Sequence, residues 1–81
     1  MRLRSQAIGD RNIIGARVEK KRKELGIKQK ELLTMLQVAG LEINSSALSK
    51  LEGQVRSVSD YEVVVFAKVL NVSLDWLLGL E

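Results

Sequence analysis

A cluster of hydrogen-bonding residues in the middle of the chain has the chemistry needed to recognise a polar partner. It consists of Asn44, Ser45, Ser46, Ser49 and Lys50. A lysine ammonium can donate to N7 and O6 of guanine, and a serine hydroxyl can contact a base edge or a phosphate. Serine and asparagine also cap helices, so Ser45 and Ser46 equally fit a structural role, and Lys50 fits that of a solvated lysine.

Helical spacing predicts that this polar cluster lies on the outer side of a short helix. Leu48 and Leu51 recur three residues apart and form an apolar face, which leaves the serines and Lys50 on the other faces. Asn44 is the expected N-cap, and Gly53 closes the segment. A helix fits the major groove of DNA, where polar side chains near its N-terminus can reach base edges. The pattern therefore favours base contacts by this face.

Four further helices and no sheet are predicted for the rest of the chain. Asn12 is the expected cap of the first helix, Ser59 and Glu62 form a capping box, and Asn71 is the expected left-handed stop of the fourth helix. The five expected helices cover about 13–25, 28–39, 44–52, 59–70 and 73–78. The predicted fold class is all-α, a compact five-helix bundle.

The positive charge is concentrated in the first half of the chain. Residues 1–31 contain ten Lys or Arg and four Asp or Glu, whereas residues 32–81 contain three and six. A basic region on a small domain indicates an anionic partner, with nucleic acid as the leading candidate, although a solvated lysine-rich helix face fits the charge equally well. With 81 residues, one domain is expected: a basic N-terminal arm at 1–12 and a folded part at 13–81.

The composition argues against an enzyme. The chain has no cysteine and no histidine, so it has neither thiolate nor imidazole ligands for zinc and no imidazole base. No glycine-rich phosphate loop is present, and no metal or cofactor is expected. The longest apolar run, Val63 to Ala67, has five residues, far below the roughly 20 that span a bilayer. A cytoplasmic protein with no membrane partner is the expectation.

Motifs spread along the chain resemble a known family. They are Gln29 at the start of the second helix, SALSKLEG at 46–53, VSD at 58–60 and VLNVSLDWLLG at 69–79. In this order they resemble the lambda-repressor-like family, also called the Cro/C1 or XRE family, over about residues 13–79. The resemblance implies a bundle with a central helix-turn-helix, in which the second helix of the motif enters the major groove. The connection at about 39–43 is longer than in a compact motif, and the glycine after Glu52 comes one place early.

The same resemblance implies roles for particular residues. Gln29 matches a glutamine that anchors the DNA backbone, although it could be only a helix-start residue. Lys28 and Arg56 are the best placed of the basic residues for further phosphate contacts. Arg22 and Glu52 match an ion pair that ties the first helix to the end of the third, because an arginine on an apolar helix face needs a partner.

Function and assembly follow from the resemblance as expectations. The chain is expected to be a sequence-specific double-stranded DNA-binding regulator, most plausibly a bacterial or phage repressor that binds a palindromic operator as a homodimer. The candidate dimer interface is the apolar C-terminal segment, with Leu74, Trp76, Leu77, Leu78 and Leu80. The alternative is an antitoxin-type or targeting module whose main partner is another protein.

Overall fold

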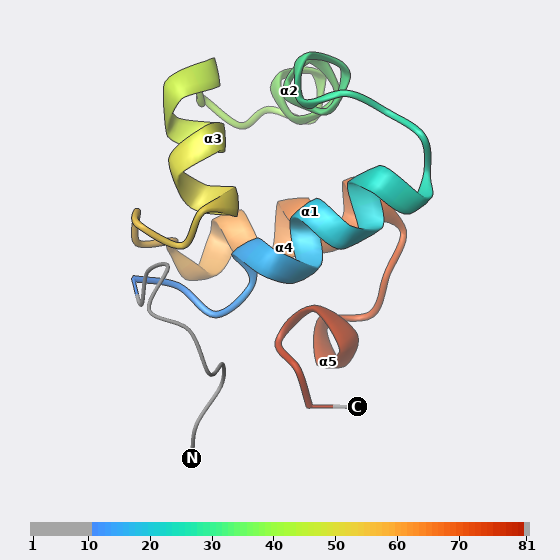
Figure 1. The fold of residues 1–81 in the computed structure, drawn as a ribbon, viewed down its shortest axis with the longest axis vertical. Coiled ribbons are helices and arrows are strands. Elements are labelled where there is room, and N and C mark those ends of the chain that lie inside the picture. The colour runs from blue at the N-terminus through green and yellow to red at the C-terminus, as the bar shows by residue number, and fades with distance from the viewer. Residues whose placement is uncertain (1–10, 81) are drawn as a thin grey trace.

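Five α-helices make up the computed structural model, which describes residues 11–80 (Figure 1). The helices are α1 (Gly15–Glu24), α2 (Gln29–Val38), α3 (Ser45–Glu52), α4 (Asp60–Leu70) and α5 (Leu74–Leu77). No strand occurs within the described range. The predicted all-α fold with five helices is confirmed, and the helix bounds differ from the expected ones by one or two residues at most ends.

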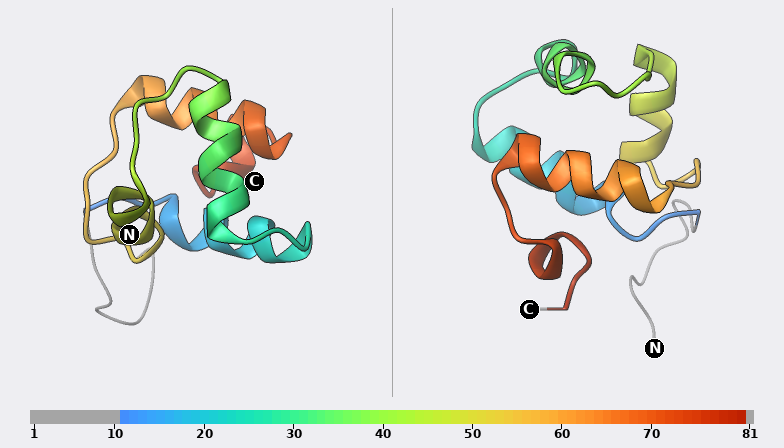
Figure 2. Two further views of the ribbon diagram at one scale, coloured as in Figure 1. Left: turned by 90° about the horizontal axis from the view of Figure 1, so that it is seen from above. Right: turned by 180° about the vertical axis from the view of Figure 1, so that it is seen from behind.

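The helices pack around a centre formed by α1 and α4. These two helices contact each other, α2 lies across both at one end of the molecule, and α5 lies at the opposite end against α4 (Figures 1 and 2). The third helix, α3, closes one side by packing on α1 and α2. Helix α3 is therefore supported on one side only, and its other side faces outward.

The core contains apolar residues from all five helices and from the connection between α2 and α3. Its buried members are Ile14, Val18, Leu32, Leu36, Leu41, Ile43, Leu48, Leu51, Val63, Phe66, Ala67, Leu70 and Leu77. Leu41 and Ile43 are both buried and anchor the long connection between α2 and α3 to the core. This burial holds the start of α3 at a defined place although the connection has no regular structure.

Helix α4 forms despite three consecutive valines, which by propensity favour a strand. The predicted capping box is present, with the Ser59 backbone N–H donating to the Glu62 carboxylate at 2.9 Å. The helix ends at Asn71, whose φ of 58° lies in the left-handed region, as predicted. The termini, together with burial of Val63 and Phe66, therefore outweigh the preference of the valine run.

The N-terminal segment is more firmly held than predicted. Helix α1 begins at Gly15 after Ile14, and Asn12 is not its formal cap, although its Oδ1 accepts from the Gly15 N–H at 2.7 Å. The Asn12 Nδ2 donates to the Leu51 and Arg56 carbonyls at 3.0 and 2.7 Å. Asn12, the last residue of the expected arm, is therefore buried against the folded part, and the neighbouring Arg11 N–H donates to the Gln54 backbone carbonyl at 3.0 Å. The rest of the expected arm, 1–10, lies outside the described residues.

The C-terminal segment corrects one expectation about the dimer. Leu77 is fully buried in the core, because α5 packs on α4, so it is not available as an interface residue. Trp76 and Leu78 are partly buried against the core, and the Arg17 guanidinium lies 5.1 Å from the centroid of the Trp76 ring. Of the five candidates, only Leu74 and Leu80 are largely exposed.

Candidate nucleic-acid interface

Helix α3 presents the polar cluster outward. Leu48 and Leu51 are fully buried and fix the orientation of the helix, while Asn44, Ser45, Ser46, Ser49 and Lys50 are all exposed. Asn44 is the N-cap, as predicted, and its side-chain oxygen accepts from the Ala47 N–H at 2.8 Å. This hydrogen bond gives Asn44 a structural role as a helix cap. The contact of Asn44 with a DNA base stays a prediction.

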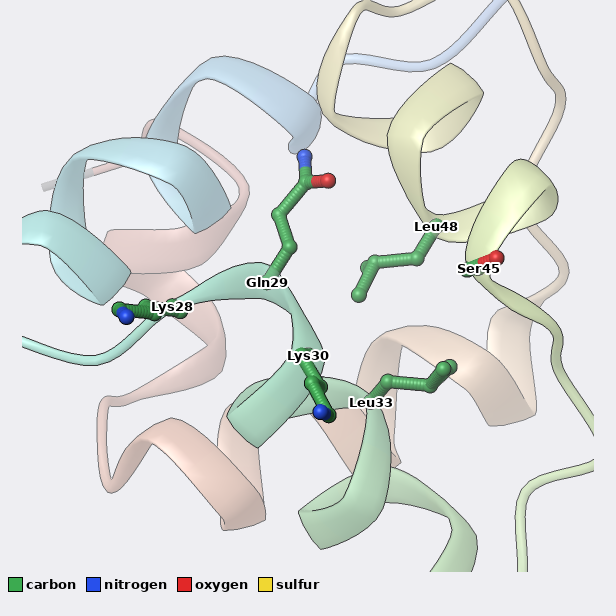
Figure 3. Close-up of a pocket in the computed structure, with 6 residues that line it drawn as sticks. All are labelled: Lys28, Gln29, Lys30, Leu33, Ser45 and Leu48. Carbon is green, nitrogen blue, oxygen red and sulfur yellow. The ribbon is translucent and has the colours of Figure 1, made fainter.

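Two surface depressions flank the N-terminal half of α3. The first, of about 440 Å³, lies between α2 and α3 and is lined by Lys28, Gln29, Lys30, Leu33, Ser45 and Leu48 (Figure 3). The second, of about 320 Å³, is lined by Asn44, Ser46, Ala47, Lys50 and Arg56. The structure thus gathers most of the predicted site residues around one helix, and Ser49 is exposed nearby without lining either depression.

Two of the three lysines of α1 pair with carboxylates, whereas the lysines beside α3 do not. On α1, Lys21 lies 3.8 Å from Glu24, and Lys23 lies 3.5 Å from Glu19. Within residues 11–80, no carboxylate pairs with Lys28, Lys30 or Lys50. These three lysines therefore place positive charge around α3 that no ion pair neutralises, and it can attract an anion.

A buried ion pair anchors α3 to α1. The Arg22 guanidinium donates through Nε to Glu52 Oε2 at 2.9 Å and through Nη2 to Oε1 at 3.1 Å. The two side chains are only 10% and 2% exposed. The third nitrogen, Nη1, donates to the Ile27 carbonyl at 3.0 Å. The expected pair is therefore present, and each nitrogen of the guanidinium has a partner, as a buried charge requires.

Gln29 extends this pair to α2. Its side-chain Nε2 donates to Glu52 Oε1 at 2.9 Å, so one carboxylate holds residues from three helices in register. A glutamine amide carries two N–H groups, and only one of them is used by Glu52. A contact between Gln29 and a DNA phosphate stays a prediction, and the geometry leaves the second N–H for it.

Arg56 is held by the protein itself. Its Nη2 donates to Glu62 Oε2 at 3.0 Å, and its Nη1 contacts Glu62 Oε1 at 3.4 Å and the Ser57 carbonyl at 3.2 Å. Burial by itself would raise the pKa of Glu62, but the hydrogen bonds from Arg56 and Ser59 outweigh it and hold this pKa below the ordinary 4.5. The expected phosphate contact of Arg56 stays a prediction, and Glu62 neutralises much of the charge it would need.

Glu62 should make the stability of the domain depend on pH in the acid range. Since its pKa is lower in the folded than in the unfolded chain, its contribution is fully present above pH 4.5 and is lost as the pH falls through the folded value. We expect the wild type to exceed Glu62→Gln in free energy of unfolding at about pH 7 and to lose this advantage toward about pH 3. Urea unfolding at a series of pH values measures the difference, and an advantage that persists unchanged at low pH would contradict the assignment.

The loop after α3 explains the early glycine. Gly53 has an ordinary φ of −80°, and the left-handed residue is Gln54, with a φ of 64°. The buried Gln54 side chain donates through Nε2 to the Asn12 backbone carbonyl at 3.2 Å, and the backbone carbonyl of Gln54 accepts from the Arg11 N–H at 3.0 Å. These long-range hydrogen bonds hold Gln54 in a backbone region that glycine would occupy more easily. Gln54 therefore positions the end of α3 and the N-terminal segment together.

Sequence reasoning missed several residues at this site. Lys30 and Leu33 are not among the residues predicted for the site, yet both line the first depression with Ser45. The spacing of Gln29 and Leu33, one helical turn apart, was an available signal. No local signal predicted the role of Gln54, because its partners lie 42 or more residues earlier in the chain.

Comparison with known proteins adds no further information about this chain. No protein-family model matches it, and no match was found among the curated proteins or the solved structures. Among the described residues, no group of three or more acidic side chains is placed to hold a metal ion. No helix in this part of the chain is long and apolar enough to cross a membrane.

Proposed function

We propose that this domain is a sequence-specific double-stranded DNA-binding regulator of transcription, with α2, its connection and α3 serving as a helix-turn-helix. The observation that carries the proposal is the outward polar edge of α3, bordered by lysines without carboxylate partners among the described residues. A helix with this edge fits the major groove, where each base pair has its own donor and acceptor pattern. The resemblance to lambda-repressor-like proteins supports the same function.

Two kinds of contact would bind the DNA, one to phosphates and one to base edges. Lys28, Lys30 and the second N–H of Gln29 contact phosphates and position the helix, with little dependence on sequence. Lys50, Ser46 and the neighbouring polar groups of the cluster then contact base edges and discriminate between sequences. The ion pair beneath α3 keeps this edge rigid, so the side chains need little ordering when DNA binds.

The proposed complex is a two-fold dimer on a palindrome. Its half-sites would lie about 34 Å apart, one turn of the duplex, so that both α3 helices enter the same side of the DNA. Leu74 and Leu80, both exposed, with the partly buried Trp76 and Leu78, are the residues proposed for the contact between protomers. Selection from random duplexes tests the function directly: a recovered palindrome supports it, and the absence of any enriched sequence contradicts it.

Lys50→Ala should reduce sequence preference more than affinity for DNA in general. We expect binding to the selected duplex to weaken about tenfold, because a donor to base edges is removed, while binding to a scrambled duplex changes little. Titrations of both duplexes give the two affinities. Lys68→Ala, an exposed lysine of α4 that lines neither depression, is the matched control and should change neither value. Equal losses for Lys50→Ala on the two duplexes would argue against base contact.

Lys30→Ala should lower the salt dependence of binding without altering sequence preference. Each neutralised phosphate contributes about 0.9 to the slope of log affinity against log salt, so the slope should fall by about that amount if Lys30 neutralises one phosphate. Titrations at several salt concentrations measure the slope, again with Lys68→Ala as the control. A slope of log affinity against log salt near zero for the wild type would contradict all of the proposed phosphate contacts.

A further inference from the structure

The depression between α2 and α3 has an apolar interior that a purely polar contact with DNA leaves without a role. Leu48 is fully buried and closes its base, whereas Leu33 of α2 is only partly buried and remains accessible within it. Figure 3 shows the two leucine side chains directed into the space between the helices, with Ser45 on the α3 side. An apolar group of a ligand could be buried here.

The surroundings of the depression restrict what that ligand can be. Lys28 and Lys30 lie on the α2 side of the depression and carry positive charge. A ligand that fits here therefore has negative charge close to the apolar group that it presents to Leu33. A phosphate would make no favourable contact with the leucines, and a wholly apolar ligand would make no favourable contact with the lysine ammonium groups. In duplex DNA, the 5-methyl group of thymine is the apolar group displayed in the major groove, with phosphates on either side.

We propose that Leu33 receives the 5-methyl group of a thymine and that this contact specifies thymine at one position in each half-site. The inference rests on the proposed DNA binding and adds a base that the polar cluster does not read. Ser45 belongs both to the polar cluster and to the wall of the depression, so a methyl group held by Leu33 of α2 lies beside base edges within reach of the first turn of α3. Burial of the methyl group against Leu33 removes apolar surface from water, which supplies the preference.

The test uses a duplex recovered by selection and removes single methyl groups from it. Each thymine is replaced in turn by deoxyuridine, which keeps the hydrogen-bonding groups and lacks only the methyl. We expect one thymine in each half-site to show a loss of about fourfold on replacement, the value for one buried methyl group, and the others to show none. Binding isotherms with the wild-type protein measure this ratio.

Variants of the protein then assign the methyl contact to Leu33. Leu33→Ala should bind the thymine and deoxyuridine duplexes equally, and Leu33→Gln, which retains a long helix-compatible side chain, should also lose the ratio if the alanine variant fails to fold. Lys30→Ala is the matched control from the same depression. It should weaken binding to both duplexes alike and retain the fourfold ratio.

The possible failures are distinguishable. The methyl contact is overturned if every thymine of the selected site can be replaced by deoxyuridine without loss of affinity. It is also overturned if a folded Leu33 variant retains the thymine-to-deoxyuridine affinity ratio. Neither result contradicts the proposed DNA binding. Failure to enrich any sequence overturns the proposed function, and the methyl contact with it.

Discussion

Glu52→Ala is expected to lower the free energy of unfolding by about 3–5 kcal/mol, because it leaves a buried guanidinium without its carboxylate. Arg22 would lose two hydrogen bonds, of 2.9 and 3.1 Å, and Gln29 would lose its acceptor. Small domains have total stabilities of about 5–15 kcal/mol, so much of the domain's stability rests on this carboxylate. Urea unfolding followed by circular dichroism measures the change.

The exposed pair of Lys23 and Glu19 on α1 offers a matched control. Their side chains are 66% and 44% exposed, and Glu19→Ala should cost at most about 1 kcal/mol, because solvent screens the pair. A loss at Glu52 no larger than the loss at Glu19 would contradict a structural role for the buried pair.

The double variant Arg22→Met, Glu52→Leu separates two causes of the expected loss. If the cost of Glu52→Ala comes from the unpaired charge, replacing both partners by apolar residues should restore most of the stability. DNA binding need not recover in this variant, because Gln29 still lacks the carboxylate that ties α2 to α3. If the free energy of unfolding recovers while the affinity for DNA does not, the ion pair also positions α3, the helix proposed to contact the bases.

Gly15→Ala should be strongly destabilising, by about 3 kcal/mol, although alanine is normally the better helix residue. A Cβ atom at Gly15 would overlap the Leu51 carbonyl oxygen and would lie 2.9 Å from Gln54 Cγ and 3.0 Å from the Glu52 carbonyl oxygen. Two of these atoms are backbone, so relief requires α1 to move away from the end of α3. Thermal and urea unfolding measure the loss, and such movement would also weaken the proposed binding of DNA.

Gly53→Ala is the natural control for this substitution. Gly53 has an ordinary φ, and its nearest neighbour, the Ser49 carbonyl oxygen, would lie 3.5 Å from a new Cβ atom. Alanine should therefore be neutral or should stabilise the domain by about 0.4–1 kcal/mol, through a less flexible unfolded chain. If the two glycines respond alike, close packing between α1 and α3 is not what requires Gly15.

Local patterns in the sequence were sufficient to predict the five helices and several of their ends. The caps at Asn44 and Ser59, and the left-handed stop at Asn71, involve groups within three or four residues of one another. The polar edge of α3 was also predictable, since the spacing of buried leucines determines which residues face outward. The Arg22–Glu52 pair was expected mainly from the resemblance to a known family.

Contacts between distant segments were decided only by the tertiary structure. Asn12 was predicted as a helix cap, yet its amide bonds residues 39 and 44 positions away, and Gly15 is required by a carbonyl of another helix. Leu77 shares its residue type with the exposed Leu74, and only the packing of α5 on α4 determines which of them is buried. Periodicity shows that a residue belongs to the apolar face of a helix. Which helix covers that face, and how deeply each residue is buried, depend on how the helices pack, and this packing is determined by contacts along the whole chain.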